Sequence, residues 1–126
     1  MSYFEESVEV VSIVGSVEIT AENCSRFVTL TTDGEFELAG AGDNAYGVIT
    51  TNQPADAAGR VAFAGIVPVE AGETIAVGDP IATGADGVAA VAGSGDPVMG
   101  IARTAGGAGD PVAVHLNRPI AVEPAA

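Results

Sequence analysis

Hydrophobic and polar residues alternate in short runs along most of the chain, which is the pattern of strands with one buried face. Such runs, rich in Val, Ile, Thr and Phe, occupy residues 8–14, 17–20, 26–31, 35–38 and 46–50. Each run is short and most are bounded by Gly, Asp or Asn, so the first half of the chain predicts hairpins of short strands.

The longest apolar run spans residues 60–69. Gly65 lies inside it and predicts a bulge or a close backbone approach, while Pro68 places that end of the strand at a sheet edge, because proline has no N–H to donate. The preceding residues 52–59 contain Pro54 and several alanines, and are compatible with one helical turn.

Gly, Asp and Pro divide the second half of the chain. The tripeptide Gly-Asp-Pro occurs at residues 78–80, 95–97 and 109–111, and residues 85–87 are a further turn signal, Ala-Asp-Gly. In each tripeptide we expect Gly to take positive φ, Asp to bond downstream backbone and Pro to begin a strand. The spacing of the three is uneven, so it does not predict a repeat protein.

Short strands separated by frequent turns predict an all-β fold, a small barrel or sandwich of short antiparallel strands. The chain has 126 residues, and we expect one β domain over residues 8–118. Residues 1–7 are predicted to form a flexible N-terminal arm, and residues 119–126, which are rich in Pro and Ala, an extended tail. Ala, Val and Gly dominate and Trp is absent, so each side chain buries little area and the chain would gain from burial in a homo-oligomer.

The charge is strongly acidic. The formal net charge is −13, lysine is absent, and the only cations are Arg26, Arg60, Arg103 and Arg118. Binding to nucleic acid or to anionic lipid requires clustered basic residues, so neither is expected as a partner. The first residues carry no basic segment followed by an apolar stretch, which argues against a signal peptide, and no apolar run is long enough to span a membrane. We therefore expect synthesis in a host cytoplasm.

The sequence offers little reactive chemistry. His115 is the only histidine and lies in an apparent strand, and Cys24 is the only cysteine, so a disulfide within the chain and a standard zinc site are both excluded. No calcium loop or phosphate-binding loop is present. The order of turn and strand residues in 70–81 is similar to that of biotinyl and lipoyl carrier domains. Those carriers need a lysine that can be modified, and this chain has none, so the carrier function is excluded. We expect no catalytic residues, no metal and no cofactor.

One family resemblance emerges from the order of the turn and strand motifs between Gly42 and Leu116. The motifs are Ala-Tyr-Gly-Val-Ile at 45–49, Gly-Arg-Val at 59–61, Gly-Ile-Val-Pro-Val-Glu-Ala-Gly at 65–72, Ala-Val-Gly-Asp-Pro-Ile at 76–81, Asp-Gly-Val-Ala at 86–89, Val-Met-Gly-Ile-Ala at 98–102 and Gly-Asp-Pro-Val-Ala-Val-His-Leu at 109–116. In this order they resemble the capsid decoration (cement) proteins of tailed bacteriophages.

The resemblance implies a β-rich, often trimeric, non-enzymatic virion protein. Such proteins bind the exterior of the capsid and clamp neighbouring copies of the major capsid protein. The proposed contact residues are Tyr3, Phe4, Glu5 and Glu6, because two of the few aromatic residues lie at this terminus, where they either fold onto the chain's own core or dock on a neighbour.

Two alternatives remain open. The first is an exterior adhesion or carbohydrate-binding β module that displays loops such as residues 105–109. The second is a small β-barrel enzyme, which would require His115 or Cys24 to lie in a pocket with acidic partners.

Overall fold

The computed structural model describes residues 8–116 of the chain, and this part is all-β, as predicted. Nine strands form one curled antiparallel sheet, a half-barrel, and the helical content of residues 8–116 is a single 3-10 turn, η2 (Ala85–Gly87). The predicted arm (1–7) and tail (119–126) lie outside the described residues. The strands are β1 (Glu9–Val14), β2 (Arg26–Leu30), β3 (Phe36–Leu38), β4 (Gly47–Ile49), β5 (Ala58–Glu70), β6 (Pro80–Thr83), β7 (Ala89–Val91), β8 (Gly100–Ala102) and β9 (Pro111–Leu116).

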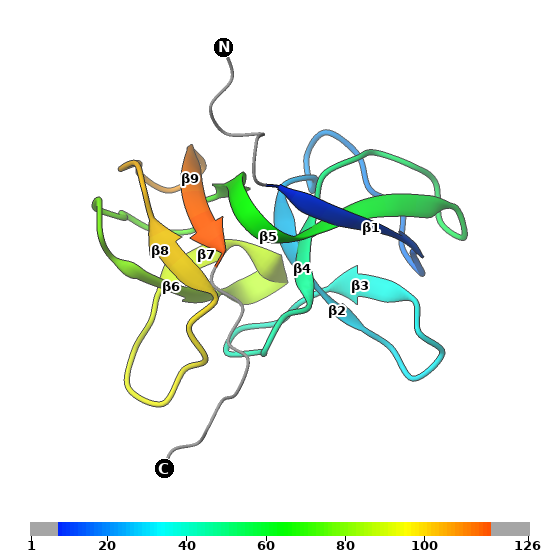
Figure 1. The fold of residues 1–126 in the computed structure, drawn as a ribbon, viewed down its shortest axis with the longest axis horizontal. Helices are drawn as coiled ribbons and strands as arrows, with labels where there is room; N and C mark the ends of the chain where they lie inside the picture. The colour runs from blue at the N-terminus through cyan, green and yellow to red at the C-terminus, as the bar shows by residue number, and fades with distance from the viewer. Residues whose placement is uncertain (1–7, 117–126) are drawn as a thin grey trace.

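Strand β5 is shared by two halves of the molecule. Its first half pairs with β1 and β4, and its second half pairs with β9. From β4 the sheet continues to β2 and β3, and from β9 it continues to β8, β6 and β7. We call residues 8–64 the N-lobe and residues 65–116 the C-lobe. In Figure 1 strands β6–β9 lie on the left and strands β1–β4 towards the right, where the first half of β5 runs alongside β1.

The two lobes repeat one strand arrangement. Val28 of β2 pairs with Leu38 of β3, and Ile81 of β6 pairs with Val91 of β7. Both residues of the second pair lie 53 positions after those of the first, 28 to 81 and 38 to 91. The same offset relates the β4–β5 register to the β8–β9 register. The chain is therefore a two-copy internal repeat, which the spacing of the Gly-Asp-Pro turns did not predict.

An isolated parallel bridge draws together the two ends of each curled sheet. Gly15 follows β1 and bridges to Phe36 of β3, while Ala71 follows β5 and bridges to Ala89 of β7. The hydrogen bonds repeat as well: Ser16 N–H donates to the Phe36 carbonyl, just as the N–H of residue 72 donates to the Ala89 carbonyl. Each lobe is thus a curled part of the sheet whose two ends are drawn together.

Four turns share one hydrogen-bonding pattern. In each, the Asp N–H donates to the carbonyl of the residue three positions earlier, and the Asp carboxylate accepts that residue's N–H at 2.8–3.0 Å. The glycine before each Asp has φ between 79° and 92°, which glycine adopts without strain. The four aspartates are Asp43, Asp79, Asp96 and Asp110.

These turns confirm the predicted positive φ of glycine and correct the predicted role of aspartate. The carboxylate bonds upstream backbone, because the N–H that such a turn leaves without a backbone partner belongs to its first residue. Pro80 and Pro111 begin strands, as predicted, whereas Pro97 precedes β8 by three residues and lies outside any strand.

Two other sequence-based predictions are wrong in detail. Residues 17–20 do not form a strand; within them Ile19 makes an isolated bridge to Gln53. Residues 52–59 are not helical, since they hold that bridge, a turn and the start of β5 at Ala58. Gly65 has a positive φ, 99°, where β5 passes from one lobe to the other. Within residues 8–116 Pro68 pairs with β9 alone, as an edge proline should.

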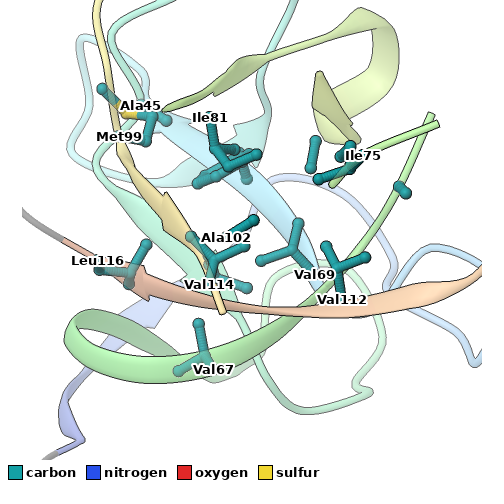
Figure 2. Packing of buried hydrophobic residues seen from close by; sticks show 14 of the residues in the cluster. Ala45, Val67, Val69, Ile75, Ile81, Met99, Ala102, Val112, Val114 and Leu116 are labelled. Atoms are coloured by element: carbon teal, nitrogen blue, oxygen red, sulfur yellow. The ribbon is translucent and has the colours of Figure 1, made fainter. Parts of the chain in front are cut away.

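The hydrophobic cores join the lobes into one unit. A smaller cluster fills the N-lobe, and a larger one fills the C-lobe and extends into the N-lobe. Figure 2 shows Ala45 of the N-lobe against Met99 of the C-lobe, with Ile81 nearby. The N-lobe residues that belong to the C-lobe's cluster are Phe27, Ala39, Ala45, Val48 and Ala62. One side of β2, β4 and β5 in the N-lobe is therefore covered by the C-lobe.

The two cores differ at one equivalent position. Phe36, which is fully buried, fills the N-lobe where the C-lobe has Ala89. The ring lies directly against Gly15, where an added Cβ would come within 2.3 Å of it. The C-lobe has alanine at both positions of this bridge, and its cluster takes in Phe27 from the other lobe instead.

Candidate interaction surface

The predicted contact residues Tyr3, Phe4, Glu5 and Glu6 lie outside the described residues. Strand β1 begins soon after them, at Glu9, and among residues 8–116 it pairs with β5 alone. Its side chains alternate: Val11 and Ile13 pack against the N-lobe core, whereas Val10 and Val14 are exposed. The structure thus places an edge strand with apolar, exposed side chains next to the predicted arm.

His115 and Cys24, the two candidate reactive residues, lie in different lobes. Cys24 packs against the N-lobe core, and its thiol donates a weak hydrogen bond to the Ile49 carbonyl at 3.8 Å. His115 is exposed at the penultimate position of β9, opposite Ile66 on β5 and Ile101 on β8. They do not form a pair, and the arrangement lacks the adjacent base that would activate the thiol.

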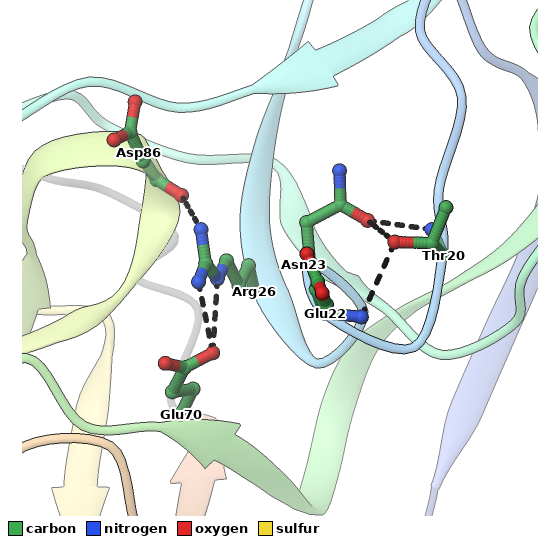
Figure 3. Close-up of polar contacts among 6 residues, drawn as sticks. All are labelled: Thr20, Glu22, Asn23, Arg26, Glu70 and Asp86. Carbon is green, nitrogen blue, oxygen red and sulfur yellow. Dashed lines mark hydrogen bonds and ion pairs between the residues drawn. The ribbon is translucent and has the colours of Figure 1, made fainter.

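An arginine clamp fixes the two lobes to each other. Arg26 of β2 donates from Nε and Nη2 to Oε1 of Glu70, at 3.1 and 3.0 Å, and from Nη1 to the Asp86 carbonyl of η2 at 3.4 Å. Figure 3 shows the guanidinium between these two acceptors. The Glu70 N–H also donates to the Ser25 carbonyl at 2.9 Å. These backbone and side-chain hydrogen bonds together stiffen the junction between the two lobes, which we call the seam. Three of the hydrogen bonds have the charged guanidinium as donor and are therefore strong.

The loop before β2 repeats the capped turn of the C-lobe with a different residue. Asn23 Oδ1 accepts the Thr20 N–H at 2.6 Å, as Asp79 accepts the N–H of residue 76. The Glu22 N–H donates to Thr20 Oγ1 at 3.2 Å, so the loop is held from both sides (Figure 3). The repeat therefore includes the loops at this end, which the structure presents as rigid, polar turns.

A shallow apolar pocket opens at the seam. Its lining includes the aromatic pair Tyr46 and Phe63, whose ring centroids are 6.5 Å apart, and it contains neither His115 nor Cys24. The lining residues are Phe27, Ala45, Tyr46, Gly47, Phe63, Met99 and Leu116. Among these lining residues Tyr46 carries the one ionisable side chain, and the lining contains no Ser, Thr, Cys or Lys that could act as a nucleophile.

A row of directly paired side chains, three of them exposed and Ile66 half-buried, crosses the C-lobe sheet on the face away from its core. Ile66, His115, Ile101 and Pro80 follow one another through the registers of β5, β9, β8 and β6. Directly paired residues project on the same face, so the four side chains form a continuous strip, which we call the C-lobe row. Ile101 is 39% exposed although it is a large apolar residue in the middle of a strand.

Within residues 8–116, no three His, Cys, Asp or Glu residues lie close enough to hold a metal ion. No helix in the same span has the length and apolar character needed to cross a membrane.

Comparison with known proteins gives a structural match. No protein-family model matches the chain, and no curated protein matches its sequence. The fold is similar to the crystal structure of the head fiber gp8.5 N base in bacteriophage phi29, with a TM-score of 0.71, over 92% of this chain and 99% of that one. At 20% sequence identity this likeness establishes a shared fold. It concerns a head fiber base and not a cement protein.

Proposed function

We propose that the chain is a non-enzymatic structural protein of a bacteriophage head, which binds the capsid exterior and stabilises neighbouring copies of the major capsid protein. The supporting observation is the near-complete fold match to a phage head fiber base. The motif order that resembles capsid decoration proteins points in the same direction. As in that family, we expect a homotrimer.

The proposed mechanism combines a rigid body with an adhesive arm. The Arg26 clamp and the shared strand β5 make the two lobes a stiff wedge. Residues 3–6 at the N-terminus supply adhesion, either to the capsid or by adding to an exposed sheet edge such as β1. Several weak contacts from linked copies raise the overall affinity without one tight site.

A second candidate function follows from the same match. The matched protein is the base of a head fiber, so this chain could also act as a capsid-bound base that carries an appendage. The two functions predict different images of the virion. A decoration protein ends at the shell surface, and a fiber base has further density projecting from it.

The arm proposal is tested by co-sedimentation with DNA-filled heads that lack this protein. We expect the full chain to bind and a variant without residues 1–7 to bind at least about tenfold more weakly, which corresponds to about 1.4 kcal/mol. A variant without residues 119–126 is the control and should bind normally. Undiminished binding by the first variant, with its fold intact, would refute the arm proposal.

The capsid-stabilising function itself needs a second measurement. Heads with bound protein should release DNA at a higher temperature than bare heads. If the full chain does not sediment with heads of any phage of its host, the proposed function is wrong.

A further inference from the structure

We propose that the C-lobe row, Ile66, His115, Ile101 and Pro80, is the surface through which one copy of this chain contacts a second copy. The proposal rests on the homo-oligomer of the proposed function and adds the contact surface, which that function leaves open.

Because the fold is an internal repeat, the C-lobe row can be compared with the residues at the same positions in the N-lobe. The N-lobe residues at the same four register positions are Val10, Ala62, Val48 and Phe27. Three of these, Ala62, Val48 and Phe27, are buried and belong to the C-lobe's hydrophobic cluster. In the N-lobe the strip is thus covered by another lobe of the same fold.

In the C-lobe three of the four equivalent residues are apolar, and within residues 8–116 His115, Ile101 and Pro80 are exposed while Ile66 is half-buried. Ile101 replaces Val48 and is 39% exposed, where Val48 is fully buried. The neighbouring outward positions, Pro68 and Ala113, are also uncharged. Exposed isoleucine and proline in mid-sheet are costly in water, and burial against a further copy would recover that apolar area.

Charge favours this chain as its own partner. The outward positions next to the row, Pro68 and Ala113, carry no carboxylate, and the N–H of the exposed Arg103 donates to the Ala113 carbonyl. Glu70, two residues beyond Pro68 on β5, is already paired with Arg26. The chain as a whole has a net charge of −13. The Arg103 cation beside the row is complementary to the acidic surface that every other copy presents.

The contact that this arrangement predicts is head-to-tail. The row lies on one lobe only, because most of its N-lobe counterpart is buried. Two rows placed face to face would bring the Arg103 cations of both copies together, so the row meets a different, acidic surface of the neighbour. Head-to-tail contacts close into rings when the rotation allows it, and a trimer is such a ring.

The experiment measures the molar mass of the full chain by sedimentation equilibrium, in low salt, over a range of protein concentrations. We expect an oligomer, at least tenfold weaker association for Ile101→Asp, and a smaller but salt-dependent loss for Arg103→Glu. Leu30→Asp is the matched control, because Leu30 is a strand residue of similar exposure, 43%, in the N-lobe. Circular dichroism verifies that each variant is folded.

The experiment distinguishes failure of the self-contact proposal from failure of the proposed capsid function. A monomeric wild-type chain, or an Ile101→Asp variant that associates as well as Leu30→Asp does, overturns it. If the chain is monomeric and Ile101→Asp abolishes head binding, the row is a capsid contact, and the self-contact proposal fails while the proposed function stands. An oligomer that depends on Ile101 but does not bind heads supports the self-contact and refutes the function.

Discussion

The bridge between Gly15 and Phe36 allows a quantitative test of how the N-lobe core is filled. Phe36 is fully buried, and truncation of such a residue to alanine costs about 3–5 kcal/mol. Gly15→Ala alone should cost about 1–3 kcal/mol, because the new Cβ would lie 2.3 Å from the ring unless the core shifts. The two single changes are therefore both expected to destabilise the protein, one by a cavity and the other by a clash.

The double variant should be more stable than the sum of the two single changes predicts. Without the ring the Cβ at position 15 has room, and it fills part of the cavity. The double variant also reproduces the bridge that the C-lobe already has, Ala71 with Ala89, so the backbone geometry is known to accept it. We expect a coupling energy of about 1–3 kcal/mol, within the range for residues in contact.

The assay is urea unfolding of the four proteins, followed by circular dichroism and analysed at constant m-value. The single variant Phe36→Ala could use up much of the stability of a domain this size, so the cycle is best measured at the temperature of maximum stability. Additive single effects, with a coupling below about 0.5 kcal/mol, would show that the ring and Gly15 do not compete for the same space.

Two further predictions concern the polar contacts. Arg26→Met removes the clamp on Glu70 and Asp86 and should lower the free energy of unfolding by about 1–3 kcal/mol, with the lower part of the range expected because the Arg26 and Glu70 side chains are 18% and 30% exposed; an unchanged urea midpoint would contradict it. Asp110→Ala leaves the Gly107 N–H without its acceptor and should cost about 0.5–1.5 kcal/mol, whereas Asp110→Asn, which keeps an acceptor oxygen, should cost less; equal losses in thermal unfolding would show that the hydrogen bond is not the cause.

The strands were predictable because specific turn residues mark where they begin and end. Gly-Asp turns end one strand and start the next, and most strands agree with the alternation of apolar residues to within a few positions. Residues 17–20 misled because alternation alone does not make a strand; apart from the isolated bridge at Ile19 they have no ladder partner. Burial also departed from alternation in β2, where Phe27 and Val28 are both buried, because both faces of the sheet are covered there.

The internal repeat was not recognised in the sequence because the Gly-Asp-Pro motifs are not at equivalent positions of the two lobes. The three Gly-Asp-Pro turns occupy three different places in one lobe, and the residue equivalent to Asp79 in the other lobe is Asn23. A detectable signal was the sequence Gly-x-Gly-Asp, which occurs at 40–43, 93–96 and 107–110. Only the first two copies are followed four residues later by a glycine that packs against a backbone carbonyl, and these two lie 53 positions apart.

The candidate surface could be predicted only in part. An acidic chain without a recognisable catalytic or metal site indicated a protein that works by binding other proteins. The position of the C-lobe row could not be predicted, because it depends on the strip being buried between the lobes in the N-lobe and exposed in the C-lobe. That is a tertiary property, and no local pattern around Ile101 or His115 expresses it.

The sharing of β5 has a consequence for how the chain assembles during synthesis. The N-lobe is completed by residue 64, so it can close while the later strands are still inside the ribosome. The second half of β5 pairs with β9, whose residues lie 41 to 51 positions further on (Glu70 with Pro111, Gly65 with Leu116), and within residues 8–116 it has no other ladder partner. Such long-range pairing is slow, and Phe27 stays in water during the wait. The last strand to emerge therefore completes the C-lobe and covers the apolar side of the N-lobe.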